Sequence, residues 1–173
     1  FSELSGKRNN IIFVGSLNKR KGLVKLLSYM QDFLNNNSSL NLNFIIVGDG
    51  PLKQNLESYV VSDKITFLGH IDDPIKLKSI FMKAFLNISL KQAGLSVVQS
   101  LGFGVPFLTF HNSISGGEKY NIVNNKNGFL VSSYEEIGKI IFKLCDDIEF
   151  QETLRKNALN YYNSNCSFNK YVN

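Results

Sequence analysis

Short apolar segments alternate with amphipathic segments along this chain, and this alternation constrains the fold more than any other feature of the sequence. The first apolar segment, residues 11–14, is rich in β-branched side chains and is followed at once by Gly15. Such a segment is typical of a strand that is buried on both faces of a parallel sheet. Five further segments of similar character predict five more strands, at residues 44–47, 65–68, 84–88, 106–110 and 128–131.

The segments between the predicted strands have the spacing of helices. Over residues 22–34 the apolar side chains recur with helical periodicity, at Leu23, Leu26, Leu27, Met30 and Phe33. Further helices are predicted over residues 51–60, 74–83, 95–103, 134–145 and 149–162. The alternation therefore predicts an α/β fold, a doubly wound six-stranded parallel sheet of the Rossmann-like type with helices on both faces.

The length of 173 residues predicts a single domain over residues 1–173. We expect residues 1–10 to form a flexible lead-in and residues 164–173 a tail. The chain begins with Phe1 rather than Met, so we interpret it as a fragment of a longer protein. Its two cysteines, Cys145 and Cys166, lack CxxC spacing, which is typical of a reducing, cytoplasmic compartment.

The charge pattern narrows the range of partners. The net charge is +5, but the cations are scattered among acids, which favours a solvated surface and still permits anionic partners such as phosphates or a membrane surface. No basic run with interleaved aromatic residues is present, so we predict no nucleic-acid binding. With two histidines and two cysteines in the chain, we predict no metal site.

In a doubly wound sheet, ligands bind outside the carboxyl ends of the strands. In this sequence those ends carry glycine with polar residues, at Gly15-Ser16, at residues 48–50, at Gly69-His70 and at residues 89–94. We therefore look for functional residues there.

The segment after the first strand has the features of a phosphate-binding loop. Lys19, Arg20 and Lys21 stand just before a predicted helix, whose free N–H groups and positive dipole end favour phosphate. Lys21 could add a point charge; alternatively, the three cations only cover an exposed loop. Gly15 is the only glycine in this turn and no Walker sequence occurs, so NAD enzymes and P-loop enzymes are both disfavoured.

The segment after the fourth strand offers a second set of ligand-binding groups. Gly94 would let a ligand approach the backbone, and the amides of Gly94 and Leu95 would face a phosphate. Gln99 lies about one helical turn further on, where its side chain could hydrogen-bond a ribose diol. The alternative for Gln99 is a packing or capping residue.

Taken in order, these pieces resemble the C-terminal domain of the glycosyltransferase group 1 enzymes, which are retaining and have the GT-B fold. The similarity runs from about residue 11 to 162. Its pieces are Phe13-Val14-Gly15 with Lys21-Gly22, residues 46–51, Phe67-Leu68-Gly69, Gly94-Leu95 with Gly104-Val105-Pro106, and residues 127–131. Each piece is weak alone, and their order and spacing together carry the resemblance.

The resemblance implies a function for the domain. It would bind a UDP- or GDP-type sugar donor, without a cofactor, for retaining transfer in cell-surface polysaccharide biosynthesis. An N-terminal acceptor domain, absent from this chain, would be its partner, so we expect the isolated domain to be inactive. A lipid-linked acceptor and peripheral contact with the inner face of the cell membrane are compatible with the resemblance.

Three positions depart from the family pattern. The family usually has two glutamates around the Gly-Leu pair, the first on the donor sugar and the second on the ribose; Lys91 and Gln99 stand there. Ser16 replaces an arginine of the family, whereas Lys21 is retained. Lys91 or Arg20 would then supply the missing cation. These changes indicate either altered sugar recognition or a non-catalytic nucleotide-binding or interaction module that keeps the fold.

Three further residues follow strand ends or a glycine pair. Glu118 stands near a family acid and would either touch the sugar or cap a helix. His70 would either lie against the nucleobase or be an exposed turn residue, and His111 matches no family role.

Overall fold

The computed structural model describes residues 8–167, so most of the predicted lead-in and tail lies outside the described residues. The strands are β1 (Asn10–Val14), β2 (Asn43–Val47), β3 (Ile65–Gly69), β4 (Ala84–Ile88), β5 (Phe107–Phe110) and β6 (Gly128–Val131). The α-helices are α1 (Leu23–Asn36), α2 (Lys53–Tyr59), α3 (Pro74–Met82), α4 (Ser96–Gly102), α5 (Tyr134–Asp146) and α6 (Ile148–Asn165). Two short 3-10 helices, η1 (Lys19–Lys21) and η2 (Glu118–Asn121), lie in the loops.

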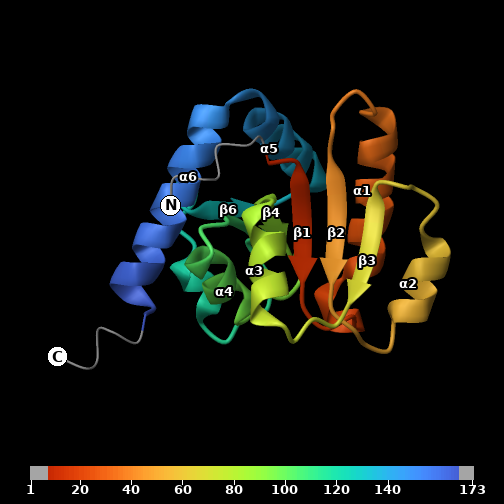
Figure 1. Cartoon of the computed structure of the whole chain (residues 1–173), viewed down its shortest axis with the longest axis horizontal. Helices are drawn as coiled ribbons and strands as arrows, with labels where there is room; N and C mark the ends of the chain where they lie inside the picture. Colours follow the sequence, from red (N-terminus) through yellow and green to blue (C-terminus); the bar gives the residue numbers. More distant parts are fainter. Residues whose placement is uncertain (1–7, 168–173) are drawn as a thin grey trace.

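The six strands form one sheet in the order β3-β2-β1-β4-β5-β6, and every pairing is parallel. The chain first builds outward from β1 to β3, then crosses back and builds outward in the other direction from β4. This order confirms the doubly wound sheet that the sequence predicts, and it places the reversal of direction between β1 and β4. Figure 1 shows the strands β1 to β3 side by side with their carboxyl ends at the bottom.

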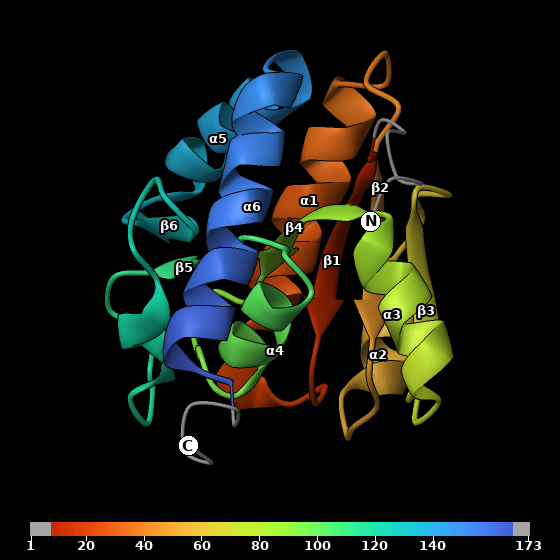
Figure 2. The same cartoon turned by 60° about the vertical axis from the view of Figure 1, so that its left-hand side comes forward.

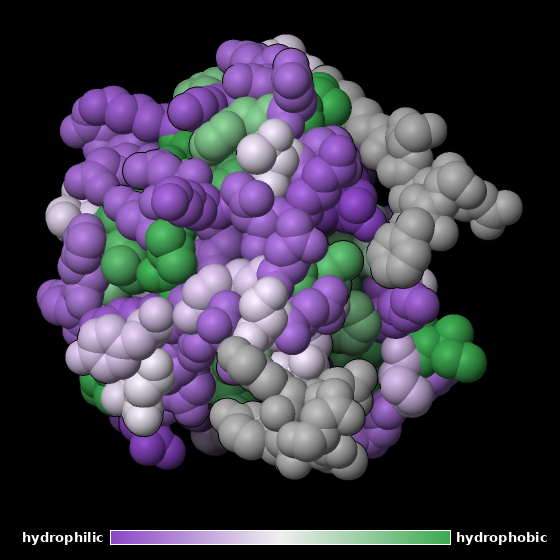
Figure 3. Space-filling view, turned by 90° about the vertical axis from the view of Figure 1, so that its left-hand side faces the viewer, coloured by the Kyte–Doolittle hydropathy of each residue, from purple (hydrophilic) through white to green (hydrophobic). Residues whose placement is uncertain are grey.

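Helices cover both faces of the sheet, as predicted. On one face the apolar sides of α1 and α5 pack on alternate side chains of the strands, including Ile11, Phe13 and Phe44. On the other face α3 and α4 pack on the intervening side chains, including Ile12 and Phe107. Figure 2 shows α3 and α4 on the near face and α1 behind the sheet. Figure 3 shows a mostly hydrophilic outer surface on the side of the molecule that carries α6.

The start of α2 differs from the prediction. The helix begins at Lys53, whereas the sequence predicted residue 51. The difference has a tertiary cause: the carbonyl of Leu17 accepts a hydrogen bond of 3.0 Å from the Leu52 amide, and the Asp49 carbonyl accepts one of 2.8 Å from the Leu17 amide. These bonds fix the turn after β2 against the loop after β1. At the other end of the chain, α6 continues past the predicted residue 162 to Asn165.

The start of β1 is anchored by a buried arginine. The Nε of Arg8 donates a hydrogen bond of 3.0 Å to the carbonyl of Met82, at the end of α3, and its guanidinium lies 3.3 Å from the Glu152 carboxylate on α6. The Arg8 side chain is almost fully buried. One residue thus ties the first strand to two helices that come much later in the chain.

One polar side chain stands out in the core beneath α3 and α4. Asn87 lies in β4 between Ile12 of β1 and Phe107 of β5, and it is 0% exposed. Neither the amide nitrogen nor the amide oxygen of its side chain has a hydrogen-bond partner among the described residues. A buried amide without partners costs about 1–3 kcal/mol in folding free energy.

We therefore predict that Asn87→Leu, which keeps the approximate shape of the side chain, raises the free energy of unfolding by roughly 1–2 kcal/mol. Urea denaturation followed by circular dichroism measures this change. Asn121→Leu is the matched control. The Asn121 side-chain amide donates a hydrogen bond to the Glu118 carbonyl, so this substitution removes an existing hydrogen bond. A loss of stability in Asn87→Leu would contradict the prediction and would indicate a buried polar partner for the amide.

Candidate functional site

The carboxyl ends of β1, β2 and β3 border a pocket of about 350 Å³. Four of the predicted site residues, Gly15, Ser16, His70 and Gln99, line it. The other lining residues are Val14, Val47, Gly48, Asp49, Ile71 and Leu77. The pocket therefore lies beside the reversal of strand order between β1 and β4, where a doubly wound sheet binds its ligands.

Two glycines allow the loops under this pocket to meet. The Gly15 amide donates a hydrogen bond of 3.0 Å to the Val47 carbonyl, and the Gly48 amide donates one of 2.8 Å to the Gly69 carbonyl. These bonds extend the strand ladder into the loops. A Cβ on Gly48 would lie 1.9 Å from the Gly15 carbonyl oxygen, and the φ angle of Gly48 is +141°. Only glycine satisfies both conditions at this position.

We predict that Gly48→Ala lowers the free energy of unfolding by about 3 kcal/mol or more, because backbone atoms cannot move aside as a flexible side chain can. The matched control is Gly94→Ala. A Cβ on Gly94 would meet nothing within 4 Å, so that variant should unfold within about 0.5 kcal/mol of the wild type. Equal stability of the two variants in denaturant titrations would contradict the predicted contact.

Lys21 lies at the end of η1, next to this pocket. Asn18 caps η1, since its side chain accepts a hydrogen bond of 3.0 Å from the Arg20 amide. The Lys21 stem passes 3.6 Å from the position of a Cβ on Gly15. Burial lowers the pKa of the Lys21 ammonium, the neighbouring Arg20 lowers it further, and Glu118 opposes both. Among the described residues no carboxylate lies within 4 Å of this ammonium group, so its charge is available to a ligand.

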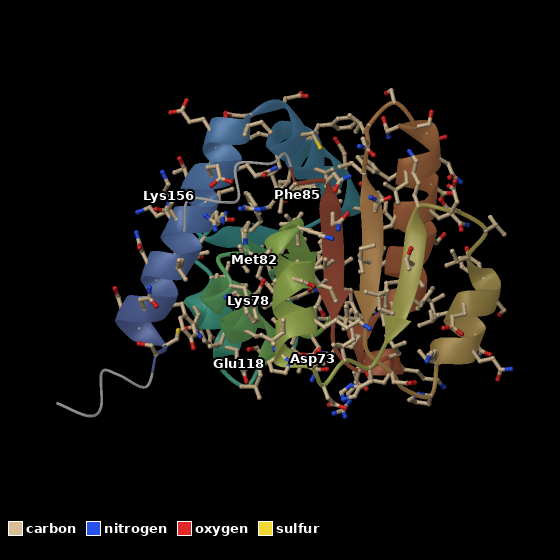
Figure 4. All side chains as sticks on the ribbon, viewed as in Figure 1. Asp73, Lys78, Met82, Phe85, Glu118 and Lys156 are labelled. Atoms are coloured by element: carbon tan, nitrogen blue, oxygen red, sulfur yellow. The ribbon has the colours of Figure 1, made fainter. Side chains whose placement is uncertain are left out.

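Glu118 begins η2 and closes its own turn. Its carboxylate accepts hydrogen bonds of 2.9 Å from the Gly116 amide and 3.1 Å from the Ser115 hydroxyl. Its own backbone amide, followed by these two groups and the positive charge of Lys21, holds the pKa of the Glu118 carboxyl below its usual value. The carboxylate thus closes the turn that precedes η2, while η2 itself has no side-chain cap hydrogen bond at Gly117. Figure 4 shows Glu118 at the same end of the sheet as the carboxyl ends of the strands.

Lys91 follows β4 and lies over the start of α1. Its Cγ and Cδ atoms would stand 2.8 Å from a Cβ on Gly22. Its backbone carbonyl accepts a hydrogen bond of 2.8 Å from the Ile114 amide, and Gln92 forms an isolated parallel bridge with Ile114. These contacts join the loop after β4 to the loop that carries Glu118. No local sequence pattern predicts the contact of Lys91 with Gly22, because the two residues are far apart in the chain.

The turn before α4 presents backbone amides to solvent. No hydrogen bond among the described residues uses the N–H groups of Gly94 or Leu95, while the Gly94 carbonyl accepts from Val97. The Leu95 side chain is 78% exposed. Gln99 is exposed, and its side-chain amide is not engaged by any described residue. The predicted groups of this segment therefore all lie open at the carboxyl edge of the sheet.

Two polar side chains border the pocket near β2 and β3. His70 is exposed and its Nε2 lies 2.6 Å from the Asp72 carboxylate. Asp49 accepts hydrogen bonds from the Gly50 amide and the Lys53 ammonium, and these bonds lower the pKa of its carboxyl. Asp49, Ile71 and Leu77 were not among the predicted site residues, although Asp49 follows a strand end as the other site residues do. His111, at the end of β5, is exposed and its carbonyl accepts from Lys119.

Within residues 8–167, no three His, Cys, Asp or Glu side chains gather in a group that could hold a metal ion. Over the same range, every helix is too short or too polar to cross a membrane.

The fold and this edge define a Rossmann-like α/β domain with a ligand crevice at the switch in strand order. Comparison with known families makes the assignment specific. The sequence model of the family described as glycosyl transferases group 1 matches residues 1–161, and the chain belongs to this family.

Two curated relatives are similar over most of the chain. The first is the GalNAc-alpha-(1->4)-GalNAc-alpha-(1->3)-diNAcBac-PP-undecaprenol alpha-1,4-N-acetyl-D-galactosaminyltransferase of Campylobacter jejuni subsp. jejuni serotype O:2, 33% identical over 88% of this chain and 43% of the relative. The second is the alpha-monoglucosyldiacylglycerol synthase of Acholeplasma laidlawii, 29% identical over 85% of this chain and 37% of the relative. The chain thus spans less than half the length of either relative.

Solved structures share the fold. The C-terminal domain of the group 1 glycosyl transferase LpcC from Francisella tularensis matches with a TM-score of 0.76 and 18% identity, over 92% of this chain and 87% of that domain. TarM of S. aureus, in a complex that contains UDP, matches with a TM-score of 0.82 and 15% identity, over 95% of this chain and 34% of TarM. HepE of Anabaena, in complex with UDP and glucose, matches with a TM-score of 0.72 and 19% identity, over 91% of this chain and 44% of HepE. The chain therefore has the fold of a GT-B C-terminal domain.

Proposed function

We propose that this domain binds the nucleoside diphosphate part of a sugar donor in the crevice at the carboxyl edge of its sheet. The observation that carries the proposal is the arrangement of Lys21 beside the glycine-lined pocket. The half-buried Lys21 stem lies 3.6 Å from the position of a Cβ on Gly15, a residue that lines the pocket, and no carboxylate of the described residues forms an ion pair with its ammonium group. An anionic ligand offsets the cost of burying such a charge.

The proposed roles follow from position. Lys21 and the amides of Gly94 and Leu95 bind the diphosphate, and Gln99 hydrogen-bonds the ribose diol. The part of the pocket bordered by His70 takes the base. The presence of UDP in the structures of TarM and HepE makes UDP the first nucleotide to test.

We further propose that the domain serves retaining transfer of a sugar to a lipid-linked acceptor in cell-surface polysaccharide biosynthesis, with peripheral contact at the inner face of the membrane. The names of the two curated relatives, one acting on an undecaprenol-linked glycan and the other making a glucosyldiacylglycerol, support a lipid-linked acceptor. A second function remains a candidate because Lys91 and Gln99 replace the two family glutamates. In that case the domain is a nucleotide-binding module without transfer activity.

The first test is calorimetric titration of the chain with UDP and GDP. We predict that one of them binds and that Lys21→Ala weakens it roughly tenfold to a hundredfold, because a hydrogen bond to a charged group contributes about 1.5–3 kcal/mol. Lys156→Ala is the control, since Lys156 lies on the outer side of α6, away from the carboxyl ends of the strands (Figure 4). Wild-type affinity in a folded Lys21→Ala variant would remove Lys21 from the site.

We also predict that this chain alone binds the donor but does not transfer its sugar. The described domain forms one wall of a crevice, and transfer requires a positioned acceptor and excluded water. Incubation with UDP- and GDP-sugars and lipid-linked acceptors, followed by product analysis, measures transfer. Activity that appears only when an N-terminal GT-B domain is supplied would support the prediction, whereas robust transfer by the chain alone would contradict it.

A further inference from the structure

Lys91 is held in a defined place rather than free on a flexible loop. The Ile114 amide donates a hydrogen bond to the Lys91 carbonyl, and the next residue, Gln92, forms the parallel bridge with Ile114. On its side-chain side the aliphatic stem lies on Gly22, which has no side chain to displace it. The β4 loop, the loop after β1 and the loop before Glu118 therefore meet at this residue.

The surroundings of Lys91 are electropositive. Gly22 is the N-terminal cap of α1 and provides no side-chain hydrogen bond, and the first turn of α1 contains no acidic residue. The three cations of η1, Lys19, Arg20 and Lys21, directly precede Gly22 in the chain. No carboxylate of the described residues lies within 4 Å of the Lys91 ammonium. An anion bound at this point would be stabilised by the positive end of the helix and by the nearby cations.

The charges of the crevice can be compared with those of a nucleoside diphosphate sugar. Each phosphate of a nucleoside diphosphate sugar carries a negative charge. Lys21 provides one positive charge, part of which is offset by Glu118, since each group affects the pKa of the other. Ser16, which lines the pocket, brings only a neutral hydroxyl. A second cation held in a defined place at this edge is Lys91, whose stem packs on Gly22, the residue that follows Lys21.

We propose that Lys91 is this second cation and binds an anionic oxygen of the donor diphosphate together with Lys21. The proposal rests on the proposed function of the crevice. It assigns Lys91 to the nucleotide and not to the sugar. It also agrees with a glycine at position 22, where φ is +69° and a Cβ would lie 2.8 Å from the Lys91 stem.

The test compares the wild type with Lys91→Gln, Lys91→Arg and the control Lys156→Gln, using UDP, GDP and uridine as probes. We expect Lys91→Gln to weaken the nucleoside diphosphate that the wild type binds by about threefold to tenfold, less than the loss from Lys21→Ala because Lys91 is more exposed. Lys91→Arg keeps the charge and should stay within about twofold of the wild type. Binding of uridine, which has no phosphate, should be the same in all four proteins.

The possible outcomes distinguish the proposed function of the crevice from the proposed role of Lys91. If the wild type binds neither UDP nor GDP, the proposed function fails and the role of Lys91 fails with it. If the wild type binds one of them and Lys91→Gln binds it equally well, the role of Lys91 alone is overturned. A loss that appears only with a donor whose sugar carries a carboxylate, such as UDP-glucuronate, and not with UDP itself, also overturns it and assigns Lys91 to the sugar. Thermal unfolding of each variant shows that the fold is intact.

Discussion

The structure depends on the position of β1, which is paired with β2 on one side and with β4 on the other, the first strands of the two halves of the sheet. The strand order reverses between β1 and β4, and α1, which follows β1, packs on the opposite face of the sheet from α4, which follows β4, so the loops that leave these two strands diverge. The space between them is left open by the backbone itself. The glycines at 15 and 48 then bring the neighbouring loops into contact, so the crevice has a rigid floor. The chemistry of the site is carried by side chains placed around this floor.

Much of the fold could be predicted from local sequence, because each buried strand is a short apolar segment and each helix has one apolar face. The six strands all occur where the sequence placed them, to within about a residue. The start of α2 was wrong by two residues since it depends on a contact with Leu17, which no local pattern encodes. The order of the strands likewise follows from pairing between distant segments and from the general handedness of such crossovers, not from any single residue.

Part of the candidate site could likewise be predicted from local sequence, and the rest depends on contacts between distant segments. Gly15, Ser16, His70 and Gln99 were predicted because they follow strand ends or fall on a helix next to one, and the structure brings them to one pocket. Ile71, after β3, and Leu77, within α3, were missed because an apolar residue in either place looks like any other core residue in sequence. The turn closed by Glu118 and the contact of Lys91 with Gly22 depend on which loops meet in space. The roles of all these residues toward a donor remain predictions.

Arg8 gives the domain a mechanical property. It is bonded to the end of α3 through a carbonyl and to α6 through a carboxylate, and it immediately precedes the central strand. A displacement of Arg8 would therefore act directly on the end of α3 and on α6. Arg8 thus couples the start of the sheet mechanically to two helices that the chain reaches only much later.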